Sequence, residues 1–239
     1  MAGGRATPYD RAMHAAAILV AAGASRRMGQ DKLLVPLAGK PLLWHTLAAF
    51  ERADTVESIT LVVARERADA VRDLLAKARF SKVTRTTLGG ARRQDSVRAG
   101  LDTAEPRDWV VVHDGARPLV TPQIIAAVLA AAEHTGAATA AAPVSDTLKL
   151  AGEGDTVLRT VPREGLWAVQ TPQAFRYELL VRAYDTVQED VTDDCAMVER
   201  LGVAVRLCAA PQWNVKVTTP GDIELADALL RRRAVRVVR

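Results

Sequence analysis

The sequence predicts an α/β protein with a mostly parallel sheet that is covered by helices on both faces. The chain has 239 residues, of which 49% are hydrophobic and 25% charged, as in ordinary globular proteins. Short apolar runs alternate with segments of helical spacing. The strongest runs lie at 15–21, 58–64 and 108–114, and the first of them is continuously apolar, which is typical of parallel strands that are buried on both faces.

The other elements continue this alternation. Leu43 and Leu47 share one face of a helix predicted over 40–53. Thr121 and Pro122 fit the N-cap and first position of a helix over 121–135. Further helices are predicted over 66–78, 92–104, 176–187, 193–201 and 220–232, and further strands around Val83 and over 137–144 and 203–208.

Residues 145–168 interrupt the pattern. Two short alternating segments flank the GEGD sequence at 152–155, which predicts a β-hairpin. Residues 1–14 lack periodicity and are expected to form a loose lead-in. Neither a repeat nor a linker divides the remainder, so we expect one domain over 1–239 with an inserted hairpin arm.

The net charge of +4 comes from the C-terminal residues. Residues 231–239 hold five arginines and no acid, so the rest of the chain carries a charge of −1. Because no aromatic residue interleaves these arginines, a solvated helix end is favoured over nucleic-acid binding. The apolar run at 15–24 is about half the ~20 residues that a spanning helix needs, and no cleavage pattern follows it, so neither a membrane span nor a signal peptide is expected. With only two cysteines, Cys195 and Cys208, a reducing, cytoplasmic location is expected.

The segment AAGASRRMGQDK at 21–32 follows the first predicted strand and suits a triphosphate. Its small residues let the backbone approach a ligand and expose N–H groups. Arg26, Arg27 and Lys32 add three positive charges. Neither the Walker A pattern nor G-x-G-x-x-G is present. A simple strand-to-helix connection is the alternative, but three cations beside the turn favour phosphate binding.

Asp114 ends the predicted strand at 108–114, where an unpaired carboxylate would be unfavourable. Mg²⁺ held by this carboxylate, phosphate oxygens and water would suit the position. A salt bridge with Arg117 is the structural alternative. His113 is expected to face the other side of the strand as a structural hydrogen-bonding group.

Two weaker signals lie elsewhere. Gly89 and Gly90 permit close contact with a base, and Ser96 offers a hydroxyl group near a helix start, although a turn with an N-cap would look the same. Lys216 lies in the apolar segment WNVKV at 213–217 and, as an inward-pointing lysine at a strand end, is a candidate for binding an anion. Since ligands of open α/β sheets bind beyond the carboxyl ends of the strands, these signals are expected at one site.

Seven segments in order over residues 15–230 resemble the 2-C-methyl-D-erythritol 4-phosphate cytidylyltransferase family of the non-mevalonate isoprenoid pathway. They are AAGASRRM with Lys32, GGARRQDSV, VVHDGARP, APVSDTLK, TVPREGLWAVQTPQAF, TDDCAMVE and NVKVTTPGD. The resemblance implies a three-layer, Rossmann-like nucleotide-diphospho-sugar transferase fold. It also implies transfer of CMP from CTP to the phosphate of methylerythritol phosphate, with Mg²⁺ and release of pyrophosphate. Such a reaction depends on positioning and charge stabilisation and needs no protein nucleophile.

The resemblance implies a role for each matching residue. The catalytic residues would be Arg27 and Lys32, which stabilise the transition state, and Arg163 and Lys216, which position the sugar phosphate. The CTP contacts would be Ala21, Ala22, Gly23, Gly90, Ser96 and Asp114, of which Asp114 would also bind Mg²⁺. Further substrate contacts would be Arg117, Thr147, Thr171 and Thr192. In this family the arm reaches across a homodimer, so Arg163 and Thr147 would serve the partner's site. Two positions depart from the family pattern, Ser25 in place of a frequent glycine and Ala91 in place of a frequent acid.

Three other interpretations compete. Ribitol 5-phosphate cytidylyltransferases share much of the motif set and differ in the polyol phosphate that accepts CMP. Molybdenum-cofactor nucleotidyltransferases resemble residues 27–43 but lack the HDGARP, PREGLW, TPQAF and NVKVT segments. A nucleotide-binding module without catalysis would be expected to have lost at least one of the charged residues assigned above.

Overall fold

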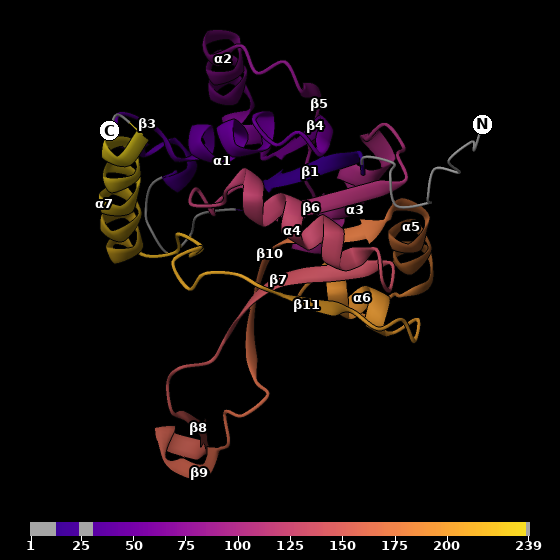
Figure 1. Ribbon diagram of the computed structural model, residues 1–239, viewed down its shortest axis with the longest axis vertical. Coiled ribbons are helices and arrows are strands. Elements are labelled where there is room, and N and C mark those ends of the chain that lie inside the picture. Colours follow the sequence, from indigo (N-terminus) through magenta and orange to yellow (C-terminus); the bar gives the residue numbers. More distant parts are fainter. Residues whose placement is uncertain (1–12, 24–30, 238–239) are drawn as a thin grey trace, which may run out of the picture.

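A seven-stranded sheet forms the centre of the computed structural model, which describes residues 13–23 and 31–237 (Figure 1). The strand order is β11-β7-β10-β6-β1-β4-β5. Strands β1, β4, β5 and β6 run parallel to one another, and β11 runs parallel to β7. Strand β10 runs antiparallel to both β6 and β7. The strands span Ala15–Ala21 (β1), Val56–Val63 (β4), Val83–Leu88 (β5), Trp109–Asp114 (β6), Ala137–Pro143 (β7), Trp167–Arg176 (β10) and Arg206–Ala209 (β11).

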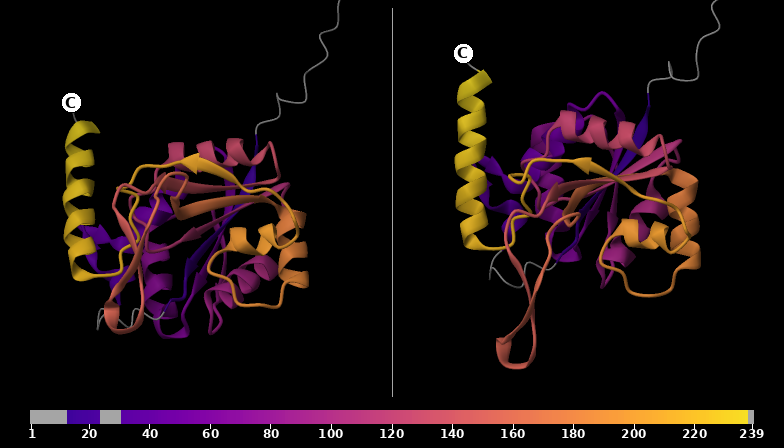
Figure 2. Two further views of the ribbon diagram at one scale, coloured as in Figure 1. Left: turned by 90° about the horizontal axis from the view of Figure 1, so that it is seen from below. Right: turned by 60° about the horizontal axis from the view of Figure 1, so that its bottom comes forward.

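Helices cover both faces of this sheet and complete three layers (Figures 1 and 2). One face packs against α1 (Leu42–Glu51), α2 (Ala68–Ala78) and α4 (Pro122–Ala132). Helix α7 (Pro220–Val237) lies at the side of the body against β2 (Pro36–Leu37) and joins the same hydrophobic cluster through Ala226 (Figure 1). The other face packs against α3 (Arg93–Thr103), α5 (Tyr177–Thr186) and α6 (Asp194–Glu199). Strand β1 shows why its sequence is continuously apolar, since Leu19 faces the first layer and Ile18 the second. The three-layer α/β fold expected from the sequence is therefore confirmed.

Strand β10 is the main element that the sequence analysis missed. It contains the buried polar residues Gln170, Thr171 and Gln173, so neither an apolar run nor a regular alternation marks it. Its pairing with β7 shifts register between Val169 and Gln173. The strand is recognisable only from its position between β6 and β7, which is tertiary information.

Three boundaries also differ from expectation. Residues 213–217 have no regular secondary structure, so the prediction that Lys216 lies at a strand end is wrong. Strand β11 covers Arg206–Ala209 instead of 203–208, and α7 continues to Val237, beyond the predicted end at residue 232. The arginine-rich C-terminal residues therefore extend a helix. Within it, the guanidinium group of Arg233 donates to Leu119 O at 2.9 Å.

The predicted hairpin is present as β8 (Leu148–Ala151) and β9 (Val157–Val161), which pair antiparallel and are joined by the short 3₁₀ turn η4 (Glu153–Asp155). Figure 1 and the right-hand view of Figure 2 show that this arm projects away from the sheet. Several of its apolar side chains are exposed, including Val157 at 61% and Leu158 at 65%.

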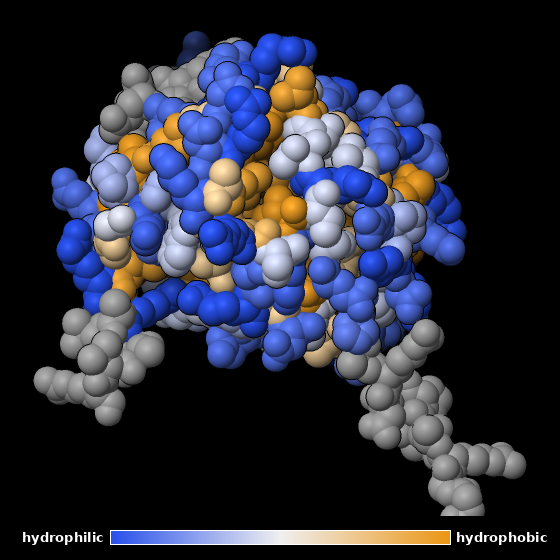
Figure 3. All heavy atoms as spheres, turned by 90° about the horizontal axis from the view of Figure 1, so that it is seen from above, coloured by the Kyte–Doolittle hydropathy of each residue, from blue (hydrophilic) through white to orange (hydrophobic). Residues whose placement is uncertain are grey.

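Seen from above, the surface is mostly hydrophilic with scattered hydrophobic side chains (Figure 3). Within residues 13–23 and 31–237, no helix combines the length and apolar character that a bilayer crossing requires. Cys195 and Cys208 are both free thiols.

Candidate active site

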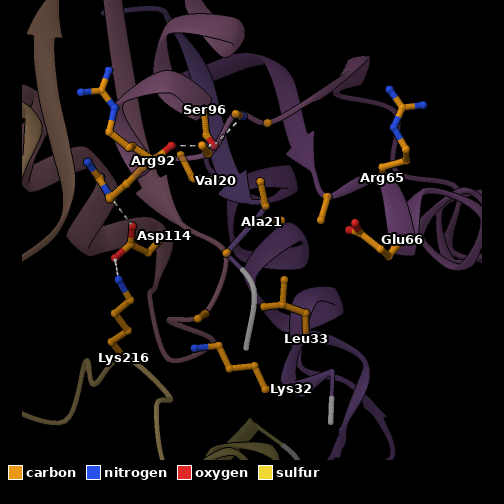
Figure 4. A pocket seen from close by; sticks show the side chains of 18 residues that line it. Val20, Ala21, Lys32, Leu33, Arg65, Glu66, Arg92, Ser96, Asp114 and Lys216 are labelled. Carbon is orange, nitrogen blue, oxygen red and sulfur yellow. Dashed lines mark hydrogen bonds and ion pairs between the residues drawn. The ribbon is translucent and has the colours of Figure 1, made fainter. Parts of the chain in front are cut away.

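A cavity of about 410 Å³ opens at the carboxyl ends of β1, β5 and β6 (Figure 4). The end of β1 contributes Ala21, Ala22 and Gly23, and the turn after β5 contributes Gly90. Asp114 is the last residue of β6. It lies at the same edge because the carboxyl ends of neighbouring parallel strands meet there. Lys32, Ser96 and Lys216 complete the predicted residues that line this cavity. Arg27 and Ser25 lie outside the described residues, as do residues 1–12 of the predicted lead-in.

Gly89 lets the turn after β5 approach β1 closely. A Cβ atom at this position would lie 2.2 Å from the Cβ atom of Ala22 and 2.6 Å from Ser96 Oγ, so no larger residue fits. Ser96 Oγ accepts a hydrogen bond from Gly90 N at 3.2 Å. The N-cap of α3 is Arg92, which excludes the simpler interpretation of Ser96 as an N-cap. The cavity wall here consists of exposed backbone and one buried hydroxyl group.

Asp114 is surrounded by three cations. Its Oδ2 atom lies 2.9 Å from Lys216 Nζ and 3.9 Å from Arg117 Nε, and its Oδ1 atom accepts from Arg93 Nε at 3.1 Å. Burial alone would raise the pKa of Asp114, but the charges of Arg93, Lys216 and Arg117 outweigh it and hold the pKa below its usual range. The salt bridge with Arg117, which was the structural alternative to Mg²⁺ binding, is thus present as the longest of three ion pairs.

The sequence analysis did not identify the buried network behind Arg93. Arg93 Nη2 donates to Asp194 Oδ2 at 2.8 Å, and Tyr184 OH donates to Asp194 Oδ1 at 2.6 Å. Burial together with the Asp194 carboxylate raises the pKa of Tyr184. Arg93 stands one helical turn before Ser96, and this spacing was a signal that could have placed both on the cavity side of α3. Asp194 follows another aspartate, and the sequence does not show which of the two turns inward.

Lys32 reaches the cavity from η2 (Lys32–Leu34), a 3₁₀ turn. Its Nζ atom donates to Val217 O at 2.8 Å, next to Lys216. Figure 4 shows Arg65 and Glu66 on the side of the cavity opposite Asp114 and Lys216. Two lysines from distant parts of the chain, Lys32 and Lys216, therefore line the same cavity.

A second cavity of about 230 Å³ adjoins the first and shares Arg93, Asp114 and Lys216 with it. Three further predicted residues, Arg117, Thr171 and Thr192, line this second cavity. Among the described residues, Arg117 Nε has the carboxylate of Asp114 at 3.9 Å and makes no hydrogen bond, while Arg117 Nη1 donates to Asn214 O at 2.8 Å. A buried donor of this kind is suited to an anionic ligand.

His113 supports the strand from behind. Its ring is fully buried, and burial lowers its pKa to about 3. Nδ1 lies 3.0 Å from Thr171 Oγ1, which accepts from Asp114 N at 3.0 Å. A neutral ring that accepts at Nδ1 from Thr171 satisfies this arrangement, and Nε2 can donate to Arg117 O at 3.3 Å. These contacts agree with the structural role expected for His113.

Two predicted residues lie away from both cavities. Thr147 and Arg163 are exposed and belong to the arm and its flanks. Arg163 Nη1 donates to Ser145 O within the same segment. The fold of one chain therefore brings together the residues of the body and leaves those of the arm apart.

The donor set allows only a limited metal site. Asp114 offers hard carboxylate oxygens, as Mg²⁺ prefers. In the part of the chain that the structure describes, no group of three His, Cys, Asp or Glu side chains is arranged to hold an ion. A divalent cation here would need phosphate oxygens and water as its remaining ligands.

At one edge of the sheet, a cavity lined by backbone groups adjoins a cluster of cations, an arrangement typical of nucleotide-binding α/β proteins. The relatives of this chain are nucleotidyltransferases. The chain belongs to the 2-C-methyl-D-erythritol 4-phosphate cytidylyltransferase family, whose profile matches residues 15–232. It is 45% identical over 217 residues to the 2-C-methyl-D-erythritol 4-phosphate cytidylyltransferase of Dehalococcoides mccartyi strain CBDB1, with 90% of this chain and 96% of that protein covered.

Solved structures show the same likeness. The 2-C-methyl-D-erythritol 4-phosphate cytidylyltransferase of Thermus thermophilus matches with a TM-score of 0.75 at 34% identity, over 92% of this chain and 100% of that chain. The 4-diphosphocytidyl-2C-methyl-D-erythritol synthase of Anaerococcus prevotii matches with a TM-score of 0.80 at 27% identity, over 92% of this chain and 97% of that chain. Each likeness therefore extends over nearly the whole chain.

Proposed function

We propose that this chain transfers the cytidylyl group of CTP to the phosphate of 2-C-methyl-D-erythritol 4-phosphate in isoprenoid biosynthesis. A phosphate oxygen of the acceptor forms a bond to the α-phosphorus of CTP, and the bond from that phosphorus to the β-phosphate oxygen breaks. Pyrophosphate leaves, and the product is 4-diphosphocytidyl-2-C-methyl-D-erythritol. Because both reactants are anions, the protein must hold them together against their repulsion.

The observation that carries this proposal is the pair of cavities that meet at Asp114 and Lys216. The larger cavity, walled by the β1 end and by Gly90 and Ser96, has room and backbone donors for a nucleotide. The smaller one, beside Arg117, suits the acceptor phosphate. Two phosphates that enter from these sides would meet where the cations are concentrated.

Each predicted residue receives a role on this basis. Lys32, together with Arg27, stabilises the charge that develops at the α-phosphate. Lys216 bridges the two cavities and positions the acceptor phosphate. The backbone from Ala21 to Gly23 and at Gly90 binds the nucleotide, with Ser96 beside the base. Arg117, Thr171 and Thr192 contact the acceptor from the second cavity.

We include Mg²⁺ as a cofactor. Asp114 would hold it, and the remaining ligands would be phosphate oxygens and water. The ion supplies charge neutralisation for the triphosphate when bound. In the described structure both carboxylate oxygens already contact cations, Oδ2 with Lys216 and Oδ1 with Arg93. These side chains would share Asp114 with the ion.

The arm suggests a homodimer in which each chain completes the other's site. Two-stranded hairpins are marginally stable alone, and the exposed apolar side chains of Leu150, Val157 and Leu158 favour burial against a second copy. Arg163 and Thr147 would then contact the acceptor bound to the partner. We also propose a cytoplasmic location, which two free thiols favour.

The test is pyrophosphate release with CTP and Mg²⁺, with 2-C-methyl-D-erythritol 4-phosphate and ribitol 5-phosphate offered in parallel. Turnover with the first acceptor alone is the expected result. Turnover with the second would keep the chemistry and change the pathway. Absence of turnover with either would contradict the proposed function.

A further inference from the structure

Arg67 is a buried arginine at the rim of the nucleotide cavity. It ends the 3₁₀ turn η3 (Arg65–Arg67) and is only 7% exposed, although its neighbours Arg65 and Glu66 are exposed and line the cavity. A buried guanidinium group requires partners for its charge and its N–H groups. The sequence analysis assigned it no role.

The partners of Arg67 lie on both sides of residues 24–30 in the sequence. Nη1 donates to Ala21 O at 2.6 Å, and Nη1 and Nη2 donate to Gly23 O at 3.2 and 3.1 Å. Nε donates to Asp31 Oδ2 at 2.8 Å. One rigid, planar guanidinium group thus joins the end of β1 to Asp31, a geometry that the single ammonium group of a lysine cannot reproduce.

These bonds decide which backbone groups face the cavity at the end of β1. In a trans peptide the carbonyl oxygen and the next N–H point in opposite directions. Since Ala21 O points to Arg67, the N–H of Ala22 points away from it. The carbonyl oxygens of Ala21 and Gly23 are also neutralised by a cation. Without that contact they would add negative potential beside an anionic ligand.

The same side chain acts on the lysine of the cavity through Asp31. Asp31 is the N-cap of η2, where its Oδ1 atom accepts from Leu33 N at 3.2 Å. Its other carboxylate oxygen is held by Arg67. The turn that carries Lys32 is therefore fixed relative to the end of β1 by an ion pair whose arginine side chain is only 8% exposed.

We propose that Arg67 is a positioning residue for the triphosphate of the bound nucleotide. Its N–H groups are directed to protein oxygens, so it acts by orienting the β1 backbone and Lys32 and not by touching the substrate. This inference rests on the proposed function, since it concerns the CTP half of the same site. It predicts an effect on CTP and not on the acceptor.

The experiment compares Arg67→Lys and Asp31→Asn with the wild-type enzyme. Steady-state kinetics give KM for each substrate, and calorimetry with CTP alone gives Kd. We expect Arg67→Lys to raise the KM and Kd for CTP by about tenfold and to change the KM for the acceptor by less than about twofold. Asp31→Asn, which keeps an oxygen for Leu33 N and removes the charge, should shift both CTP constants in the same direction by about threefold. Arg72→Ala, an exposed arginine on α2, is the matched control and should change neither.

Two results would overturn the inference. One is a folded Arg67→Lys variant with unchanged CTP constants, and the other is an equal rise in KM for both substrates, which indicates general damage. If Arg67→Lys does not fold, Asp31→Asn decides by the same criteria. A wild-type chain that binds CTP but turns over no acceptor would contradict the proposed function, while the Kd comparison would still decide the role of Arg67.

Discussion

Asp114 and Arg163 are assigned to the same reaction, yet their surroundings are opposite. Asp114 is buried and has Lys216 and Arg93 within 3.1 Å, and the strand that carries it is packed on both faces. Arg163 is exposed on a hairpin that projects from the body (Figure 1). The body of the chain has a preorganised site, whereas the arm supplies its residues only when another surface holds it.

The largest expected effect tests the preorganised site in the body of the chain. Lys32→Ala should lower kcat by about 10²-fold or more, because one fixed positive charge at the transition state is lost. Lys40→Ala is the matched control, since Lys40 is an exposed lysine near Trp44 that lies outside the nucleotide cavity. A Lys32→Ala enzyme with nearly normal kcat would show that the charge of Lys32 is not used in the transition state.

The second prediction joins the two regions in one experiment. If the arm acts on the partner's site, a heterodimer of one Lys32→Ala chain and one Arg163→Ala chain has one intact site. That site combines the pocket of the Arg163→Ala chain with the arm of the Lys32→Ala chain. We expect each homodimer to be nearly inactive and the purified heterodimer to recover up to about half of the wild-type activity. A verified heterodimer without recovery would argue against an arm that works across subunits.

A third prediction separates the two substrates within the pocket. Lys216→Ala should raise the KM for the acceptor phosphate by about tenfold, with a smaller effect on CTP, because Lys216 reaches from Asp114 into the second cavity. Asp114 retains Arg93 and Arg117 in this variant, so the buried carboxylate is still paired. The KM values for both substrates provide the check, and an effect on CTP alone would reject this assignment.

The fourth prediction concerns the arm alone. Val157→Ser should weaken dimerisation by about tenfold or more, since it removes about 1–2 kcal/mol of apolar burial at an interface. At concentrations where both proteins are monomeric, the melting temperature should stay the same, because Val157 belongs to neither core cluster. Sedimentation measures the dissociation constant of the dimer. Leu207→Ser, which changes an exposed apolar residue of β11, is the control. Equal dissociation constants for the dimers of the two variants would contradict an arm-mediated interface.

The sequence predicted the body of the fold better than its antiparallel strand. Continuous apolar runs and helix caps were sufficient for β1, β4, β6 and α4, because these elements are held by local patterns that the core then buries. Strand β10 was not predicted because its buried positions carry Gln170, Thr171 and Gln173. The hydrogen-bond partners of these residues come from distant segments. Burial of polar residues follows from tertiary contacts and leaves no periodic signal.

The candidate site shows the same limit. Motifs placed Asp114, Ser96 and Lys216 at one edge, because strand ends of a parallel sheet converge. Motifs did not distinguish Arg93 from Arg92, nor Asp194 from Asp193, since neighbours in sequence point in different directions once the helix forms. The role of Arg67 could not be predicted from the sequence for a different reason. Its partners include backbone carbonyl oxygens, which carry no sequence signature.

The smallest expected effect probes how the segment after Lys216 is held. Burial raises the pKa of Asp222, but hydrogen bonds from Thr218 and Thr219 outweigh it and lower the pKa below its usual value. The folded state therefore binds the proton more weakly than the unfolded chain, and this stabilisation is present above about pH 4 and lost as the pH falls through the lowered pKa.

Asp222→Asn should thus reduce the free energy of unfolding by about 0.5–1 kcal/mol at pH 7, the usual range for a helix cap in contact with water. The difference from the wild type should shrink toward zero as the pH falls through the lowered pKa of Asp222, because protonation removes the same charge from the wild-type carboxyl group. Urea titrations at several pH values measure it, with Glu224→Gln, an exposed acid on α7, as the control. A difference that is constant with pH would mean that the charge of the Asp222 carboxylate does not stabilise the turn at Thr218 and Thr219. The segment after Lys216 would then depend on the packing of α7 instead.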